Sequence, residues 1–295
     1  NSRIITSSTD NKSITGIVTL IFQYQNVGPN SNTSINVSNY ISSNNKKIFF
    51  STDKTIYLTD SVGSFLSSLY SVDNDYIGCL TSNNNGDTLY FLQTSTTNSN
   101  PSIMMMTTNN LNAINVGSVP AGYNDMRQFK YVNGDFYYHH NDNIMKISNG
   151  NVSAINLGSN YSFTVSNSGT VYRAYYTGGP GGNYAISGTS YSQNNTPYDL
   201  DYSDSENRIY MWENDNGGKI SYLDLNTNSQ TILFQPNNGI QSSTSNMEQV
   251  VRYDDSFVYF NEAMSLFSVG NNGNNSRIIT SSTDNKSITG IVVVD

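Results

Sequence analysis

The sequence predicts an all-β fold, a single β-propeller made of four-stranded antiparallel blades. Three observations predict it. A short motif recurs six times at intervals that match the length of one blade. Runs of alternating polarity flank each motif, as half-buried strands require. The first 18 residues are repeated letter for letter near the end of the chain, which suits a circular fold whose two ends must meet.

The recurring motif is a polar turn, then an aliphatic or aromatic residue, then an aromatic residue. Successive motif aromatics lie between 35 and 49 residues apart. This spacing is typical of a propeller whose blades each contain four strands. The six instances are Asn45–Phe49, Asn85–Tyr90, Asn133–Tyr137, Ser168–Tyr172, Glu206–Tyr210 and Asp254–Tyr259.

Strand-like runs precede and follow these motifs, and turn residues separate them. The runs before the turns are Tyr76–Leu80, Gln128–Val132, Tyr161–Val165 and Glu248–Tyr253. Those after the aromatics are Thr55–Leu58, Ile103–Met106, Ile144–Ile147, Tyr184–Ile186, Ile220–Leu225 and Leu266–Val269. No segment keeps a helical period over three turns, so we expect no long helix.

The number of blades depends on the chain ends. From Tyr259 to the next expected Phe49, counted across the repeat, is 64 residues, which is long for one blade and short for two. Leu20–Tyr24 reads as the central strand of a further blade, with Ser13–Val18 as its inner strand. The sequence therefore favours seven blades over six.

The duplicated segment is predicted to close the ring. Residues 1–295 form one propeller domain in this interpretation, and Asn275–Val292 duplicates Asn1–Val18. Propellers leave no open sheet edge when strands from both chain ends share a blade. One closing position then has two identical possible occupants. The residues predicted to make this closure, or an assembly through it, are Arg3, Ile4, Ile14 and Ile17 with their copies Arg277, Ile278, Ile288 and Ile291.

Three origins of the duplication remain open. The natural protein could be a tandem array of propellers, of which this chain spans one unit and an overlap. One copy could instead insert into a neighbouring molecule and build a filament by strand addition. The overlap could also be artificial. If the duplication has either of the first two origins, the expected partner is another copy of this chain.

Composition restricts the function classes. Charged residues make up 12% of the chain, against about 25% in typical soluble domains. A polar surface built from Asn, Ser, Thr and Tyr suits adhesins and shells, so we expect an extracellular or cell-surface location. The net charge of −8 argues against a nucleic-acid partner. No apolar run is long enough to cross a bilayer, and Cys79 is expected to be buried.

The motifs resemble those of YWTD-like propellers, with Ile56-Tyr57-Leu58-Thr59-Asp60 as the best match. The chain is especially similar to a bacterial cell-surface β-propeller family of unknown function. This resemblance implies a secreted or surface-attached module without established chemistry. The Trp-Thr-Asp part is missing from every repeat, so the ligand preferences of receptor-type YWTD propellers are not implied.

We find no catalytic or metal site. Acidic clusters occur at 199–206, at Glu213 and Asp215, and at 254–255, where most are predicted to lie in turns. Paired carboxylates could serve glycoside hydrolysis. We expect no cofactor. The less favoured alternative is a structural calcium ion near Asp199, Asp201 and Asp204.

Aromatic residues are the other candidate binding groups. Tyr175, Tyr176, Tyr198, Tyr202 and Trp212 cluster in the fourth and fifth repeats, where they could stack on sugars or proteins or line blade packing. We therefore expect a non-enzymatic binding, adhesion or structural module that assembles through its terminal strands. A lectin-like propeller is the alternative, and a polysaccharide-active enzyme is less favoured.

Overall fold

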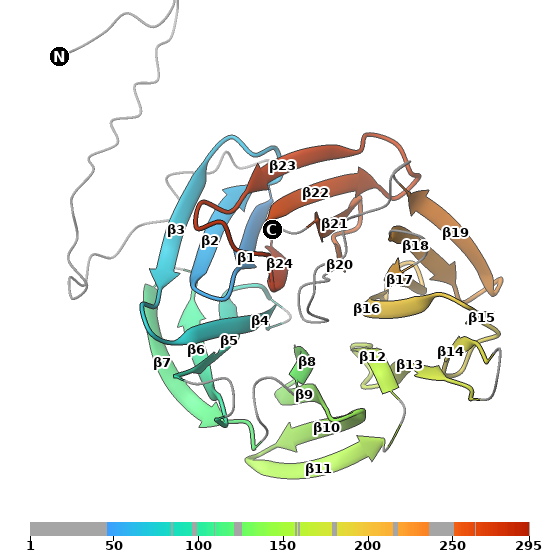
Figure 1. Cartoon of the computed structure of the whole chain (residues 1–295), viewed down its shortest axis with the longest axis horizontal. Helices are drawn as coiled ribbons and strands as arrows, with labels where there is room; N and C mark the ends of the chain where they lie inside the picture. The colour runs from blue at the N-terminus through green and yellow to red at the C-terminus, as the bar shows by residue number, and fades with distance from the viewer. Residues whose placement is uncertain are drawn as a thin grey trace, which may run out of the picture. The chain divides into compact units, whose positions relative to one another are not determined.

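The structure is a computed structural model, and it describes residues 46–83, 85–95, 99–108, 110–120, 126–156, 158, 160–178, 182–214, 218–235, 251–262 and 264–294. These residues form six four-stranded antiparallel sheets, which we number as blades 1 to 6 (Figure 1). The predicted propeller of four-stranded antiparallel blades is confirmed. Of the described residues, none belong to a helix long and apolar enough to cross a bilayer.

Within each blade the strands run in order from the innermost to the outermost. Blade 1 contains β24 (Gly290–Val294), β1 (Lys47–Ser51), β2 (Thr55–Asp60) and β3 (Leu66–Ser71). Blade 2 contains β4 (Tyr76–Ser82), β5 (Thr88–Thr94), β6 (Ser102–Thr107) and β7 (Asn110–Ser118). Blade 3 contains β8 (Met126–Val132), β9 (Asp135–His140), β10 (Asn143–Ser148) and β11 (Asn151–Asn156).

The second half of the ring repeats this order. Blade 4 contains β12 (Asn160–Val165), β13 (Val171–Tyr176), β14 (Tyr184–Ile186) and β15 (Ser192–Gln193). Blade 5 contains β16 (Thr196–Ser203), β17 (Arg208–Asn214), β18 (Lys219–Asp224) and β19 (Ser229–Phe234). Blade 6 contains β20 (Val251–Tyr253), β21 (Phe257–Glu262), β22 (Ser265–Gly270) and β23 (Arg277–Ser281).

The prediction of seven blades is wrong for the described ring. Its inner strands contact one another in the order β24, β4, β8, β12, β16, β20 and back to β24. Because β20 already touches β24, there is no room for another inner strand between blades 6 and 1. The candidate seventh-blade strands, Ser13–Val18 and Leu20–Tyr24, lie outside the described residues.

All six sequence motifs have the same place in the fold. Each motif aromatic lies on the second strand of a blade, and in blades 2 to 6 the motif turn leads into that strand. In the hairpin of blade 3, Asn133 and Gly134 have φ angles of 52° and 93°. Such positive values suit the tight turns that match strand twist. The short polar turns therefore set the register that directs the motif aromatics.

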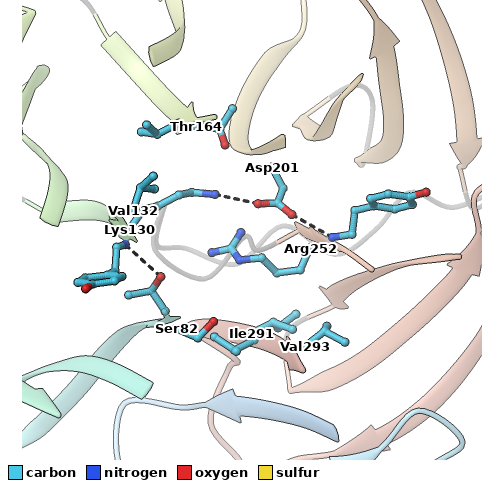
Figure 2. A pocket seen from close by; sticks show the side chains of 13 residues that line it. Ser82, Lys130, Val132, Thr164, Asp201, Arg252, Ile291 and Val293 are labelled. Atoms are coloured by element: carbon cyan, nitrogen blue, oxygen red, sulfur yellow. Dashed lines mark hydrogen bonds and ion pairs between the residues drawn. The ribbon is translucent and has the colours of Figure 1, made fainter. Parts of the chain in front are cut away.

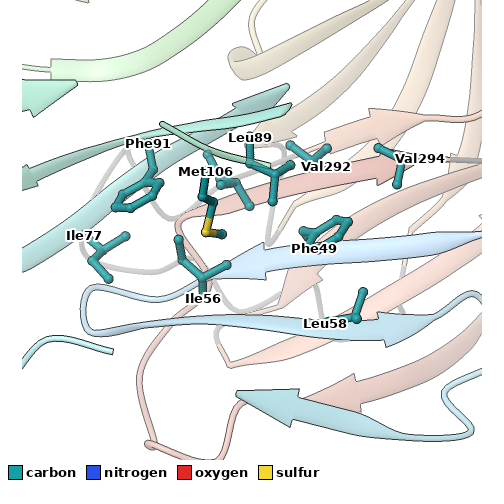
Figure 3. Packing of buried hydrophobic residues seen from close by; sticks show 10 residues of the cluster. Phe49, Ile56, Leu58, Ile77, Leu89, Phe91, Met106, Val292 and Val294 are labelled. Atoms are coloured by element: carbon teal, nitrogen blue, oxygen red, sulfur yellow. The ribbon is translucent and has the colours of Figure 1, made fainter. Parts of the chain in front are cut away.

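Buried side chains form six clusters, and each cluster joins two neighbouring blades. We call each of these contacts a seam. Figure 3 shows the seam between blades 1 and 2, where Phe49 and Ile56 face Leu89 and Phe91. At about 25 cal/mol per Å² of buried apolar surface, such contacts are the main force that holds blade to blade.

The C-terminal copy of the duplicated segment lies in two blades. Its first part is β23, the outermost strand of blade 6, and its second part is β24, the innermost strand of blade 1. Strand β24 pairs antiparallel with β1, from Lys47 opposite Val294 to Ser51 opposite Gly290. The ring is thus closed by pairing the last described strand with the first.

Strand β24 contributes to the seams on both of its sides. Val292 and Val294 pack in the seam with blade 2, whereas Ile291 packs in the seam with blade 6. This follows from the alternation of side chains along a strand. One five-residue strand therefore holds blade 6, blade 1 and blade 2 together.

Candidate functional site: the central channel

The innermost strands leave one edge without a strand partner, and side chains from neighbouring blades satisfy several of its amides. Thr81 on β4 accepts a hydrogen bond from the Tyr131 amide on β8 at 3.2 Å. Gln128 on β8 accepts one from the Phe163 amide on β12 at 2.6 Å. An uncapped edge amide would cost free energy. Polar residues on the inner strands therefore complete the ring where no further strand can pair.

The buried carboxylate of Asp199, on β16, accepts hydrogen bonds from more than one other inner strand, and we call such a residue a junction. Asp199 is the main junction of the channel. Its Oδ2 accepts hydrogen bonds from the Val251 amide at 2.9 Å and from Arg252 Nη1 at 2.7 Å. Its Oδ1 accepts one from the Gln128 side chain. Asp199 is 2% exposed, so its charge requires these partners. This one carboxylate connects blades 3, 5 and 6.

Asp201, two residues along β16, forms a second junction closer to the mouth. Its Oδ2 accepts from the Tyr253 amide at 3.0 Å, and its Oδ1 lies 3.1 Å from Lys130 Nζ. Lys130 also donates to the Leu200 carbonyl at 2.7 Å. Asp199 and Asp201 thus bind alternate amides of β20, because residues two apart on a strand point the same way.

A cavity of about 210 Å³ lies above these junctions. Residues from all six inner strands line it, so it is the mouth of the central channel. Figure 2 shows Lys130 and Arg252 reaching into this opening from different strands, with Asp201 beside the end of Lys130 and with Ile291 and Val293 of β24 below. We call this cavity the channel mouth.

Burial shapes the electrostatics of the channel. The pKa of Lys130 is lowered, first by burial and then by the charge of Arg252, although Asp201 and Asp199 oppose the shift. Burial, with a further contribution from Asp199, raises the pKa of Cys79 to about 12. Cys79 is 6% exposed, as the sequence predicted. Its thiol is therefore protonated and shielded from solvent.

The channel mouth opens at the end of the ring where inner strands turn into second strands, which we call the hairpin face. Its turns are connected from blade to blade. Asn133 donates to the Asn167 carbonyl, and the Asn167 amide donates to Asp204 at 3.0 Å. Ser205 donates to Asp255 at 2.9 Å. Since these bonds link the turns of blades 3 to 6 in succession, that part of the hairpin face is a preorganised surface.

The carboxylates lie only partly where the sequence predicted, because Glu206, Asp254 and Asp255 are in turns whereas others are in strands. Asp199 and Asp201 belong to the inner strand β16, not to a turn, whereas Asp204 lies in the hairpin turn that follows. Buried Glu213, on β17, accepts hydrogen bonds from Tyr191 at 2.6 Å and from Ser221. No group of three or more His, Cys, Asp or Glu side chains among the described residues gathers as metal ligands would.

The predicted closure residues have different fates. Ile288 and Ile291 are completely buried, and exposed Arg277 donates to the Ser61 carbonyl at 2.7 Å. Ile278 was predicted to face the core, but it is 61% exposed. A register shift in the pairing of β22 with β23 turns Ile279 inward instead. The counterparts Arg3, Ile4, Ile14 and Ile17 lie outside the described residues.

The predicted aromatic cluster does not form one exposed platform. Trp212 is 1% exposed within the seam between blades 5 and 6, so its selection as a stacking residue is wrong. Tyr198 packs against Trp212 at 6.3 Å between ring centroids, and Tyr202 packs against Tyr172 at 5.1 Å. Half-buried Tyr175 and Tyr176, on β13, are left as the aromatics on which glycan binding would depend.

Sequence reasoning missed Gln128, Lys130 and Arg252. A usable signal was present, since Asp199 and Asp201 are two residues apart in a run that precedes a motif turn. That spacing places two carboxylates on one side of an inner strand. Their partners come from positions about 50 and 70 residues away, and no local pattern identifies those.

No protein-family model and no curated protein matches this sequence. Solved structures do match. A chain from a nidogen/laminin complex aligns with a TM-score of 0.63 at 12% identity, over 85% of this chain and 98% of that one. TolB from Acinetobacter baumannii aligns with a TM-score of 0.57 at 13% identity, over 84% of this chain and 66% of that one. At such identities the likeness shows the β-propeller fold alone.

Proposed function

We propose that this chain is a non-enzymatic β-propeller of a secreted or cell-surface protein, and that it joins copies of itself through the duplicated closure strands. It acts in this proposal as an adhesion or structural module whose partners are proteins. The likeness to a propeller from a complex of nidogen with laminin supports protein partners for this fold. The neutral polar composition supports a location outside the cell.

One observation carries the assembly proposal: the side chains that hold the C-terminal copy in the ring are present, unchanged, in the N-terminal copy. Asp284 accepts from Thr52 at 2.6 Å, and Thr283 hydrogen bonds with Tyr57 at 3.3 Å. Ser281 bonds with Ser265 at 2.8 Å, while Ile288 and Ile291 are buried. The corresponding residues of the N-terminal copy are Ser7, Thr9, Asp10, Ile14 and Ile17.

The N-terminal copy therefore has the groups needed to occupy a vacant closure position in another ring. Identity ends after Val18, so Thr19 and Leu20 would take the places of Val293 and Val294. Val294 is buried against Gly86. Because Leu20 would replace Val294 there, the two copies would pack similarly, but not identically, at that end of the strand.

Exchange between two closed rings replaces one set of contacts by nearly the same set. Its remaining cost is the entropy of association, about 4–15 kcal/mol at a 1 M standard state. We therefore expect exchange where chains are crowded, as on a surface, or where a closure position is empty. Tethering raises the effective concentration in the same way.

Catalysis is not part of the proposal because the buried carboxylates already have partners. Asp199 and Asp201 each accept hydrogen bonds on both oxygens. Glu213 does so too. A general acid or base must instead be free to exchange a proton with a substrate.

The test uses a chain that lacks residues 275–295, in which the closure position is empty. We expect its N-terminal copy to enter the ring of another molecule, so that sedimentation velocity shows folded dimers or larger species. Ile17→Asp should abolish them, because the equivalent Ile291 is buried. Asn11→Asp adds the same charge where the equivalent Asn285 is exposed, and it should leave assembly unchanged.

Two results would count against assembly. A folded monomer would show that each chain closes its own ring with its N-terminal copy. An unfolded monomer, unaffected by either substitution, would show that the N-terminal copy does not enter the closure position at all.

A further inference from the structure

The channel mouth has cationic hydrogen-bond donors that no other described residue uses. Arg252 commits Nη1 to Asp199 and to the Val251 carbonyl. Its Nε and Nη2 have no partner among the described residues, and the residue lines the cavity. Lys130 commits two of its three donors, to Leu200 and to Asp201, and also lines the cavity.

The acceptors at the same place are already used. Both oxygens of Asp199 and both oxygens of Asp201 accept hydrogen bonds from the protein. A cationic ligand would have to displace those bonds, whereas an anionic ligand meets donors that are open. The positive charges of Lys130 and Arg252 balance the negative charges of the two aspartates, so no net charge attracts the ligand. The directions of the open hydrogen-bond donors decide instead which ligand binds.

The size and walls of the cavity restrict the ligand further. A volume of about 210 Å³ is smaller than the roughly 300–1,000 Å³ of pockets for drug-sized molecules. Val132, Val165 and Ile291 supply apolar walls for a few methylene groups. The space therefore suits the end of a side chain or of a peptide.

We propose that the channel mouth binds a carboxylate on a short aliphatic stem, held by the free edge of the Arg252 guanidinium and by Lys130. A planar guanidinium presents paired donors at the spacing of carboxylate oxygens. The carboxylate could belong to an Asp or Glu side chain of a protein partner, to the end of a peptide, or to a small free acid.

This site is distinct from strand exchange, and its test can fail without affecting the assembly proposal. The two features meet in β24, because Ile291 and Val293 line the channel mouth. The cavity is therefore complete only when the closure position is occupied. The experiment consequently uses the full chain.

The probe is propionate, with propionamide as a neutral analogue of the same shape and ethylammonium as a cationic control, at constant ionic strength and pH 7. We expect saturation transfer from the protein to propionate alone, and competition by glutarate. Arg252→Lys keeps a cation opposite Asp199 but removes the free edge of the guanidinium, with its Nε and Nη2 donors. It should weaken propionate binding at least tenfold. Arg208→Lys, at a surface arginine paired with Glu206 and Asp224, should leave binding unchanged.

Circular dichroism and the urea midpoint establish that both variants fold. Equal saturation transfer to propionate and propionamide would overturn the proposal, and so would undiminished binding to the Arg252→Lys variant. Two hexapeptides identify the natural source. One has a single Glu and an amidated C-terminus, and the other has no acidic side chain and a free C-terminal carboxylate. If propionate binds but neither peptide competes, the ligand is a small free acid.

Discussion

The closure strands and the channel both hold blades together, but they do so with opposite chemistry. Strands β23 and β24 bury aliphatic side chains in the seams on either side of blade 1. The channel connects blades 3, 5 and 6 through Asp199, Arg252 and Gln128. Apolar packing adds up over many small contacts, whereas a buried charge network depends on every member. The channel is therefore expected to be less tolerant of a single change.

The largest expected effect is at Asp199. Asp199→Ala leaves the partly buried guanidinium of Arg252 without its partner, and it leaves the Val251 amide without an acceptor. We expect a loss of about 3–5 kcal/mol in the free energy of unfolding, measured by urea titration. Asp204→Ala, in an exposed turn with one hydrogen bond to a backbone amide, should cost less than about 1 kcal/mol. Equal losses would contradict the central place of the channel network.

The next effect compares two isoleucines within the duplicated segment. Ile291→Ala opens a cavity in the seam of blades 6 and 1, and should cost about 2–5 kcal/mol. Ile278→Ala changes a side chain that is 61% exposed, so it should stay within about 0.5 kcal/mol. Both changes in the free energy of unfolding are measured from the urea midpoints, with equal slopes of the unfolding transitions. A loss at Ile278 as large as that at Ile291 would show that β23, and not β24, makes the essential contact.

Acid should weaken the turns of the hairpin face. Burial raises the pKa of Glu206, but hydrogen bonds from Tyr210 and Arg208, with a contribution from the neighbouring Tyr253 hydroxyl, outweigh it, so that its pKa lies below the ordinary 4.5. A lowered pKa in the folded state gives stability that is complete above pH 4.5 and is lost as the pH falls through the lower value.

Glu206→Gln removes that contribution. Between pH 6 and pH 3 the urea midpoint of the variant should therefore fall less than that of the native chain. Hydrogen bonds also lower the pKa of Asp87 and Asp135, so part of the acid sensitivity should remain. Parallel curves for the two proteins would refute the role of Glu206.

The smallest effect concerns the reactivity of the Cys79 thiol, and it involves no change in the free energy of unfolding. With a pKa of about 12 and 6% exposure, its thiol should not react with Ellman's reagent at pH 8 in the folded chain. Reaction should begin at the urea concentration at which circular dichroism reports unfolding. Rapid labelling of the folded chain would show that the channel interior is open to solvent.

The sequence predicted the fold through local signals. Six turns followed by aromatics led to six blades whose second strands begin as expected, because tight turns and alternation act over a few residues. The count of seven failed because ring closure is a long-range property. The chain passes directly from blade 6 into β24 of blade 1, and no local feature of Ser287–Val294 states which strand it pairs with.

The candidate site was predictable only in part. The closing role of Ile288 and Ile291 followed from the repeat, whereas Ile278 was assigned to the wrong face because a register shift cannot be read from alternation. Trp212 was taken for a binding residue since the sequence does not distinguish an exposed aromatic from one in a seam. Lys130 and Arg252 were missed because their partners are distant in the chain.

Whether the N-terminal copy can enter the position that β24 holds is open to a direct test by disulfide trapping. Ser51 Oγ lies 3.2 Å from Thr289 Oγ1 in the closed ring, and Thr15 is the copy of Thr289. A chain lacking residues 275–295, with Ser51→Cys and Thr15→Cys, is oxidised and run on a non-reducing gel. We expect disulfide-linked dimers and larger species. Disulfides formed only within single chains, or no disulfide between positions 15 and 51 at all, would contradict the proposed exchange.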